Sequence, residues 1–407
     1  MRPYTIARLR RHFGVMAALS VGPLVATSFA RFAYALVLPA MRSELDLTYS
    51  QAGSLNTANG LGYLVGSLIA MRYASRWGNR RLFVAGMIVT VLALFGTGIT
   101  DSFYALLCLR AIAGVSGALV FISGVVLASS LFPDRPALSA AAIATYFGGA
   151  GVGIVVSGVA IPWILATMGH HAWRDAWLAI AGASAVLAVF SIRASARVND
   201  PVTTRANVAW PARELSAALT SYFLFGLGYI GYMTFVVASM KSKGASHVDV
   251  ALTWGTLGMA ATLAPLVWRV PRSRWDASKM LPFIGLVITV GAAIPLYSVS
   301  RPAMIMSALL FGVAMFSIPA SITDLVKVSL PKAAWGSAMA FFTVMFAIGQ
   351  IIGPLFTGWL ADATHALNAG LAGSTVILLA ASLIAMYQRQ VVIRSSRRRD
   401  PRATTAV

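Results

Sequence analysis

Cysteine and charged side chains are scarce in this sequence. Cys108 is the only cysteine among 407 residues, and it lies within a predicted helix. An intrachain disulfide and a thiolate metal cluster are therefore excluded, and redox chemistry is not the main activity. Charged residues make up 11% of the chain and hydrophobic residues 58%. This composition excludes a soluble globular protein and indicates a chain surrounded mostly by lipid.

Acidic residues are especially few, with 12 against 32 lysines and arginines. All of them fall in predicted loops or near predicted helix ends: Glu44, Asp46, Asp101, Asp134, Asp175, Asp200, Glu214, Asp249, Asp276, Asp324, Asp362 and Asp400. Without a carboxylate in mid-span, the sequence offers no dedicated acidic proton relay. Asp324, at the inner end of a predicted helix, is only a weak candidate for that role.

Patterns for metal binding and catalysis are also missing. The histidines lie in tails, loops or helix ends, and none pairs with a methionine or carboxylate at i, i+4 inside a span. The 16 methionines are therefore interpreted as core filler, and no metal site is expected. No cluster of acid, base and nucleophile indicates an enzyme, so neither catalysis nor a cofactor is expected.

Long uncharged runs recur along the whole chain. A bilayer core about 30 Å thick needs about 20 apolar residues for each helical crossing. Runs of this kind predict an all-α membrane protein with twelve transmembrane helices. The predicted helices are residues 13–38, 50–71, 82–100, 103–128, 137–162, 174–192, 214–239, 248–268, 280–299, 302–326, 335–361 and 369–388. The first run continues past the small residues near Ser28 to Pro39, which favours a retained helix over a cleaved signal peptide.

Basic residues are distributed unevenly between the two sides of the predicted membrane. If the N-terminus is cytoplasmic, only a few lysines and arginines lie on the periplasmic side: Arg42, Arg174, Lys241, Lys243 and Arg301. This bias predicts a multi-pass protein of the cytoplasmic (inner) membrane with both termini in the cytoplasm. The basic tail, residues 390–407, is expected to contact anionic lipid headgroups, and no nucleic-acid partner is expected.

The two halves of the sequence resemble each other. A shift that aligns Ser75-Arg76-Trp77 with Ser273-Arg274-Trp275 also pairs Gly114 with Gly312 and Pro133 with Pro331. A loop tripeptide and two prolines at one register indicate a parallel duplication. We expect two pseudo-symmetric six-helix bundles, residues 1–192 and 214–389, joined by a polar cytoplasmic linker, residues 193–213.

Three motifs resemble those of the major facilitator superfamily. The loop from Ser75 to Arg81 is similar to its gating loop, with Arg76, Gly78, Arg80 and Arg81 at basic and glycine positions, although Ser75 replaces the usual Asp and Met71 the leading Gly. Helix 4 from Arg110 to Ala118, including Gly114, resembles its helix-4 arginine motif. Helix 11 resembles its glycine-rich seam between domains through Gly349, Gly353 and Pro354.

Two further stretches resemble one branch of that superfamily. Ala30-Arg31-Phe32-Ala33-Tyr34 with Leu38-Pro39-Ala40-Met41, and the stretch from Asn56 to Leu64, are similar to the YbfB/YjiJ-type branch. The resemblance implies the superfamily fold and a transporter, expected as a monomer, whose halves rock about a central small-molecule site. It also implies a cavity lined by helices 1, 4, 7 and 10, but it names no substrate.

Two arginines are predicted inside the membrane. Arg31 and Arg110 lie about 12 Å and about 13 Å below the outer ends of their helices, at 1.5 Å per residue. An unpaired arginine there costs about 2.5–3.5 kcal/mol on insertion scales. Backbone carbonyls, water or a bound anion can offset that cost, and only the anion implies a function. Arg31 is the better candidate, because the superfamily motif already accounts for Arg110, which can instead bind neighbouring helices.

Tyrosines and amides can complete such a site. Tyr229 and Tyr232 of helix 7 are expected to line the opposite wall, and Tyr34 and Asn59 to shape the pocket, with ordinary packing as the alternative for each. Tyr222, Asn56 and Gln350 are interpreted as packing residues. An arginine binds a carboxylate through two parallel hydrogen bonds, and tyrosine hydroxyls can orient the rest of the anion.

These residues predict a secondary active transporter for a small organic anion, coupled to a proton or to an exchanged anion by symport or antiport. The expected substrate-binding residues are Arg31, Tyr34, Asn59, Arg110, Tyr229 and Tyr232. The alternative is a proton-coupled drug efflux antiporter. Helix 5 lacks the proline of the superfamily's antiporter motif between Gly149 and Ile154, and Arg31 stands where an acidic proton site would be convenient.

Overall fold

The computed structural model describes residues 6–200 and 210–388, and every regular element within those ranges is a helix. The predicted linker lies partly, and the predicted basic tail wholly, outside the described residues. The all-helical prediction holds throughout the ranges that are described.

The N-terminal half consists of α1 (Ile6–Pro23), η1 (Leu24–Phe32) and α2 (Tyr34–Glu44), which together form the first span, followed by five further long helices. These are α3 (Tyr49–Trp77), α4 (Asn79–Ile99), α5 (Phe103–Ser129), α6 (Pro136–Met168) and α7 (Trp173–Ser195), with the short η2 (His170–Ala172) before α7. Their positions agree with the six apolar runs of the first half.

The C-terminal half repeats this arrangement. After η3 (Ala212–Leu215) it contains α8 (Ser216–Ser242), α9 (His247–Val267), α10 (Arg269–Arg274), α11 (Ala277–Tyr297), α12 (Arg301–Met315), α13 (Ser317–Ser329), η4 (Lys332–Ala334), α14 (Trp335–Ala363) and α15 (Leu367–Ala385). Helices α12 and α13 together take the place of the tenth predicted span.

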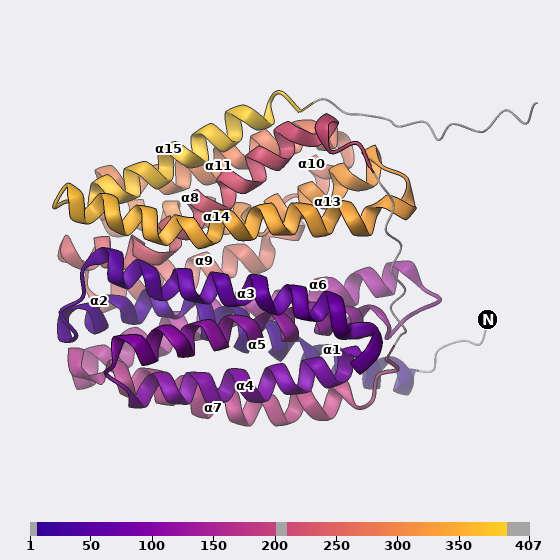
Figure 1. The fold of residues 1–407 in the computed structure, drawn as a ribbon, viewed down its shortest axis with the longest axis horizontal. Helices are drawn as coiled ribbons and strands as arrows, with labels where there is room; N and C mark the ends of the chain where they lie inside the picture. The colour runs from indigo at the N-terminus through magenta and orange to yellow at the C-terminus, as the bar shows by residue number, and fades with distance from the viewer. Residues whose placement is uncertain (1–5, 201–209, 389–407) are drawn as a thin grey trace, which may run out of the picture.

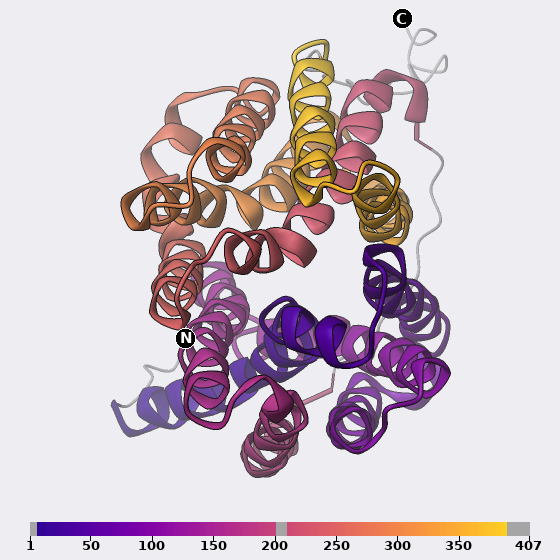
Figure 2. The ribbon, with the colours of Figure 1, turned by 90° about the vertical axis from the view of Figure 1, so that its left-hand side faces the viewer.

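The two halves lie side by side, with their long helices roughly parallel to the longest axis of the molecule (Figure 1). Seen end-on in Figure 2, the early helices form one group and the later helices the other. The halves meet along α3 and α14, α6 and α9, and α2 and α8. We call the end with the α3–α4 junction the Gly78 end, and the end where α14 finishes the Asp362 end.

Within the described residues, eleven helices are long and apolar enough to cross a membrane. Helix α3 is the long helix that does not meet this criterion, because it carries Asn56, Asn59 and several glycines. It packs between α5 and α14 inside the molecule, where small residues allow close approach. A methyl group on Gly62 would lie 2.0 Å from the Ala111 carbonyl oxygen, so α3 and α5 touch through their backbones.

Two spans that the sequence predicts as continuous helices are interrupted. In the first span, Pro23 is followed by the π-helix η1, where the Ala33 amide donates to the Ser28 carbonyl at 2.8 Å. In the tenth span, the helix breaks at Phe316, just before Pro319, which has no N–H to donate to the preceding turn. Proline therefore accounts for both interruptions, and the first one changes the path of the segment that carries Arg31.

Candidate functional site

Arg31 lies in η1 and is buried, with 7% of its surface exposed. Its Nε and Nη2 atoms are inaccessible to solvent and have no hydrogen-bond partner among the described residues. The guanidinium carbon lies 5.6 Å from the centroid of the Tyr63 ring on α3. Arg31 is thus a buried charge with donor capacity that the described protein groups do not use.

The charge of Arg31 also reaches the other half of the molecule. It interacts electrostatically with Tyr63 of α3 and with Tyr229 of α8. The Tyr229 hydroxyl accepts a hydrogen bond from Gln350 Nε2 of α14 at 2.9 Å, which leaves its own hydrogen without a described acceptor. Side chains from both halves therefore interact with Arg31, and none of those named here carries a negative charge.

Arg110 occupies a different environment. Its side chain is 2% exposed and lies over the rings of Tyr34 and Trp177, at 4.8 and 5.8 Å. Its Nη1 donates to the Ala30 carbonyl at 2.5 Å, and its Nη2 lies 3.4 Å from Asn56 Oδ1. Arg110 thus binds the backbone just before Arg31. This contact agrees with the alternative that Arg110 binds a neighbouring helix.

Tyr34 and Asn59 belong to the same network around Arg110. The Tyr34 hydroxyl donates to the Ala52 carbonyl at 2.7 Å, and Asn59 Nδ2 donates to the Arg110 carbonyl at 3.1 Å. Both side chains are almost fully buried. Their polar atoms bond to backbone carbonyls of α3 and α5, so each of these side chains already has a partner within the N-terminal half.

The two predicted helix-7 site residues, Tyr229 and Tyr232, have different partners. Tyr232 stacks on Phe311 with ring centroids 4.2 Å apart, and its hydroxyl bonds to Ser307 Oγ at 2.7 Å, inside the C-terminal half. Tyr229 bonds to Gln350 of α14 and interacts electrostatically with Arg31. Residues three positions apart share a helix face, so the difference between Tyr232 and Tyr229 comes from their partners.

Tyr63 was not among the substrate-binding residues expected from the sequence, and Gln350 was interpreted as a packing residue. Tyr63 stands in the predicted second helix, which the resemblance did not place among the cavity-lining helices. A signal for it was available: Arg31 and Tyr63 are the charged and aromatic residues nearest the middle of their two spans. Gln350 could not be assigned from sequence, because its partner, Tyr229, is 121 positions away.

The loop that resembles the gating motif contains a glycine that the backbone requires. Gly78 has a φ of +81°, which favours glycine, and a methyl group there would lie 2.7 Å from Asp200 Oδ2. Asp200 accepts hydrogen bonds from the Arg80 amide at 2.9 Å and from Asn79 Nδ2 at 3.0 Å. Asp200 therefore supplies a carboxylate to this loop, in which Ser75 replaces the usual Asp.

The arginines of this loop differ in what they contact. Arg80 Nε donates to the Ser195 carbonyl at the end of α7 at 3.1 Å, and Arg80 also bonds to the Val198 carbonyl. Arg76 and Arg81 are exposed. Arg80 thus ties the start of α4 to the end of α7, both within the N-terminal half.

The glycines of helix 11 lie differently from expectation. Cβ atoms on Gly349 and Gly353 would lie 2.2 Å from the Phe223 carbonyl oxygen and 2.3 Å from the Leu227 carbonyl oxygen. Both glycines thus face α8 of their own half and not the seam between the halves. Gly114 similarly meets a carbonyl oxygen of α3, inside the N-terminal half.

Pro354 does lie at the seam between the halves. Its carbonyl oxygen would be 2.3 Å from a Cβ on Gly53 of α3. The Gln350 carbonyl oxygen would similarly lie 3.3 Å from a Cβ on Gly60. Small residues of both helices therefore let α3 and α14 approach each other, since a Cβ on Gly358 of α14 would lie 2.3 Å from the Tyr49 carbonyl oxygen of α3.

The two halves are bonded to each other toward the Asp362 end. Asp362 accepts hydrogen bonds from the amides of Tyr49 and Ser50, at 2.9 and 2.7 Å, and from the Ser50 hydroxyl at 2.5 Å. Asn56 Nδ2 donates to Thr234 Oγ1 at 2.6 Å. A carboxylate is favourable at a helix N-terminus, so Asp362 of α14 binds the start of α3 in the other half.

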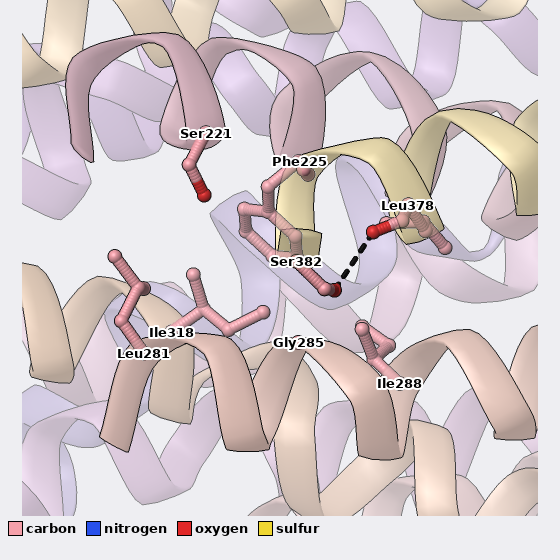
Figure 3. A pocket seen from close by; sticks show the side chains of 9 residues that line it. Ser221, Phe225, Leu281, Gly285, Ile288, Ile318, Leu378 and Ser382 are labelled. Carbon is pink, nitrogen blue, oxygen red and sulfur yellow. Dashed lines mark hydrogen bonds between the residues drawn. The ribbon is translucent and has the colours of Figure 1, made fainter. Parts of the chain in front are cut away.

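A small pocket inside the C-terminal half does not coincide with this site. It is lined mostly by apolar side chains from α8, α11, α13 and α15, as Figure 3 shows. The Ser382 hydroxyl on its wall donates to the Leu378 carbonyl at 2.8 Å. No group of His, Cys, Asp and Glu residues within the described ranges could hold a metal ion.

Comparisons with known proteins agree with this architecture. The family described as "Uncharacterised MFS-type transporter YbfB" matches residues 23–386. Among relatives, YttB of Bacillus subtilis is 22% identical over 95% of this chain and 98% of its own length. YycB of the same organism is 22% identical over 86% of each chain.

Solved structures share the fold at low sequence identity. A mutant of the nucleoside transporter NupG superposes with a TM-score of 0.74 at 13% identity, covering 92% of this chain and 98% of that one. The D-xylose-proton symporter gives a TM-score of 0.73 at 13% identity, covering 94% and 99%. Together with the family match, these likenesses confirm the predicted superfamily fold. The chain therefore belongs to the YbfB-type family of major facilitator superfamily transporters, which are multi-pass membrane proteins and not enzymes.

Proposed function

We propose that this transporter moves a small organic anion and that Arg31 binds the anion. The observation that carries the proposal is the buried guanidinium of Arg31, whose Nε and Nη2 have no partner among the described residues. A buried charge costs several kcal/mol unless it is paired, and a carboxylate would supply both the opposite charge and two acceptor atoms.

The surroundings of Arg31 support an anion over a cation. Every ion pair within the described residues lies near the ends of the helices, and none includes Arg31 or Arg110. The Tyr229 hydroxyl adds a donor from the other half. A cation at this position would be repelled by two arginines, whereas an anion would bind groups from both halves at once.

The position of Arg31 also suits alternating access. Arg31 lies over Tyr63 of α3 in its own half and interacts electrostatically with Tyr229 of α8 in the other, so a ligand bound there links the two halves that must move. We propose that the Gly78 end faces the cytoplasm of the inner membrane, in keeping with the basic residues in its loops. The coupling partner is then a proton carried with the anion, or a second anion in exchange, and the monomer is the transporting unit.

Thermal stabilisation of the purified protein tests this proposal. Small carboxylates should raise the melting temperature of the wild type but not of Arg31→Gln, because a ligand that binds only the folded state stabilises it. Arg193→Gln, at an exposed position, is the matched control and should respond like the wild type. Equal stabilisation of wild type and Arg31→Gln by lipophilic cations, with no response to carboxylates, would instead support drug efflux.

A further inference from the structure

Beside Arg31, the C-terminal half presents a stack of nearly parallel aromatic rings. Phe346 of α14 stacks on Tyr222 with centroids 4.7 Å apart, and on Tyr229 with centroids 5.8 Å apart. Phe225 adds a fourth ring, 5.0 Å from Tyr229. The interplanar angles of these pairs lie between 13° and 19°. Phe346 is only partly buried, so the stack is not completely covered by protein.

The N-terminal half contributes another ring next to Arg31. Tyr63 is partly buried, lies under the Arg31 guanidinium and contacts Phe121 on its own side. Tyr63 interacts electrostatically with both Tyr229 and Tyr222 across the halves. No ring contact joins Tyr63 to either residue in the described part of the chain, although aromatic pairs in contact have centroids about 4.5–7 Å apart. Gly60, one turn before Tyr63 on α3, approaches the Gln350 carbonyl of α14, one turn after Phe346, so Tyr63 and Phe346 come from neighbouring positions along the seam and are not stacked on one another.

We propose that the transported anion is an aromatic carboxylate, whose planar ring lies between Tyr63 and the partly buried Phe346, which contacts the other three rings of the stack. This rests on the proposed function, because Arg31 would bind the carboxylate. The Tyr229 hydroxyl, already oriented by Gln350, would donate a further hydrogen bond. A flat ring fits between aromatic faces, where offset stacking adds to the free energy gained by burying its surface.

The chemistry at this position separates three classes of solute. An aliphatic acid satisfies Arg31 but gains no stacking. A neutral aromatic compound stacks but leaves the guanidinium unpaired. An aromatic cation stacks but is repelled by Arg31. Only an aromatic carboxylate both pairs with Arg31 and stacks on the aromatic rings, so ion pairing and stacking should both increase its affinity.

Binding measurements with benzoate, cyclohexanecarboxylate, acetate and benzamide test the proposal on the full-length purified protein at constant ionic strength. Benzoate should bind about tenfold tighter than cyclohexanecarboxylate or acetate, an advantage of the size expected for one good stacking contact. Benzamide should bind far more weakly than benzoate. Tyr63→Leu and Phe346→Leu should each reduce this preference for the planar ring while retaining binding of acetate.

Controls make the outcome specific. Phe95→Leu, at a ring that is 52% exposed on α4, should leave the preference unchanged. If benzoate and cyclohexanecarboxylate bind equally, or both leucine variants keep the wild-type preference, the substrate class is wrong while the Arg31 site stands. If no carboxylate binds in an Arg31-dependent way, the proposed function fails as well.

Discussion

At the scale of single residues, the two intramembrane arginines differ in how the protein compensates their charge. Arg110 has a carbonyl, an amide oxygen and two ring faces around it, and only its Nε lacks a partner among the described residues, so the fold stabilises most of that guanidinium. Arg31 has one ring face and two unpartnered nitrogen atoms among the described residues. Residues that bind a ligand often make the ligand-free protein less stable. The contrast indicates that Arg31 is such a residue and that Arg110 is not.

The contrast predicts that replacing each arginine by glutamine affects the stability of the ligand-free protein differently. Arg110→Gln removes the donor to the Ala30 carbonyl and should lower the free energy of unfolding by about 1–3 kcal/mol. Arg31→Gln removes a buried charge that lacks a full set of partners, and should leave the melting temperature unchanged or raise it. Thermal denaturation in detergent without added anions measures both. A larger loss of stability in Arg31→Gln than in Arg110→Gln would contradict the assignment.

At the scale of elements, the apolar runs predict where the helices begin and end, because lipid requires long uninterrupted stretches of apolar side chains. The interruptions at η1 and Phe316 were not predicted, since each depends on how a proline is accommodated within a packed bundle. The partners of Tyr34 and Tyr232 were not predicted either. Their hydroxyls bond to Ala52 and Ser307, and the choice between these partners and a ligand is made by packing between helices. Arg31 was identifiable from sequence because an intramembrane charge is rare wherever it occurs.

The contact between α14 and α3 predicts how the Asp362 end opens. Asp362 binds the first two amides of α3, and these bonds must break before the halves separate there. Asp362→Asn weakens a charge-assisted contact with a helix N-terminus, which is worth about 0.3–2 kcal/mol, so it should increase the population open at this end several-fold. Spin labels at Tyr104→Cys and Tyr297→Cys, both highly exposed at that end, report the distance between halves after Cys108→Ser removes the native thiol.

Asp101→Asn provides the control for this measurement. Asp101 lies at the same end but pairs with Arg174 inside the N-terminal half, so its loss should not change the distance between the labels. An unchanged distance distribution in Asp362→Asn, or an equal change in Asp101→Asn, would show that the contact does not hold the two halves together.

At the scale of the whole molecule, the two six-helix halves meet around Arg31, whose charge neither half neutralises fully. The seam toward the Asp362 end is closed by Asp362, by the Asn56–Thr234 bond and by the backbone contact of Gly53 with Pro354. The Asp200 network at the other end lies within the N-terminal half. Closure at one end, with the unpartnered Nε and Nη2 of Arg31 between the halves, suits a carrier whose cargo completes the contact between the halves.

Uptake into proteoliposomes tests that account most directly. Wild-type protein and Arg193→Gln should accumulate radiolabelled benzoate, driven by an outward gradient of unlabelled benzoate. Arg31→Gln should reduce this exchange by about 30-fold or more, because losing one partner of a desolvated charge pair costs about 2–5 kcal/mol. Uptake by Arg31→Gln at the wild-type rate would contradict the claim that Arg31 binds the transported anion.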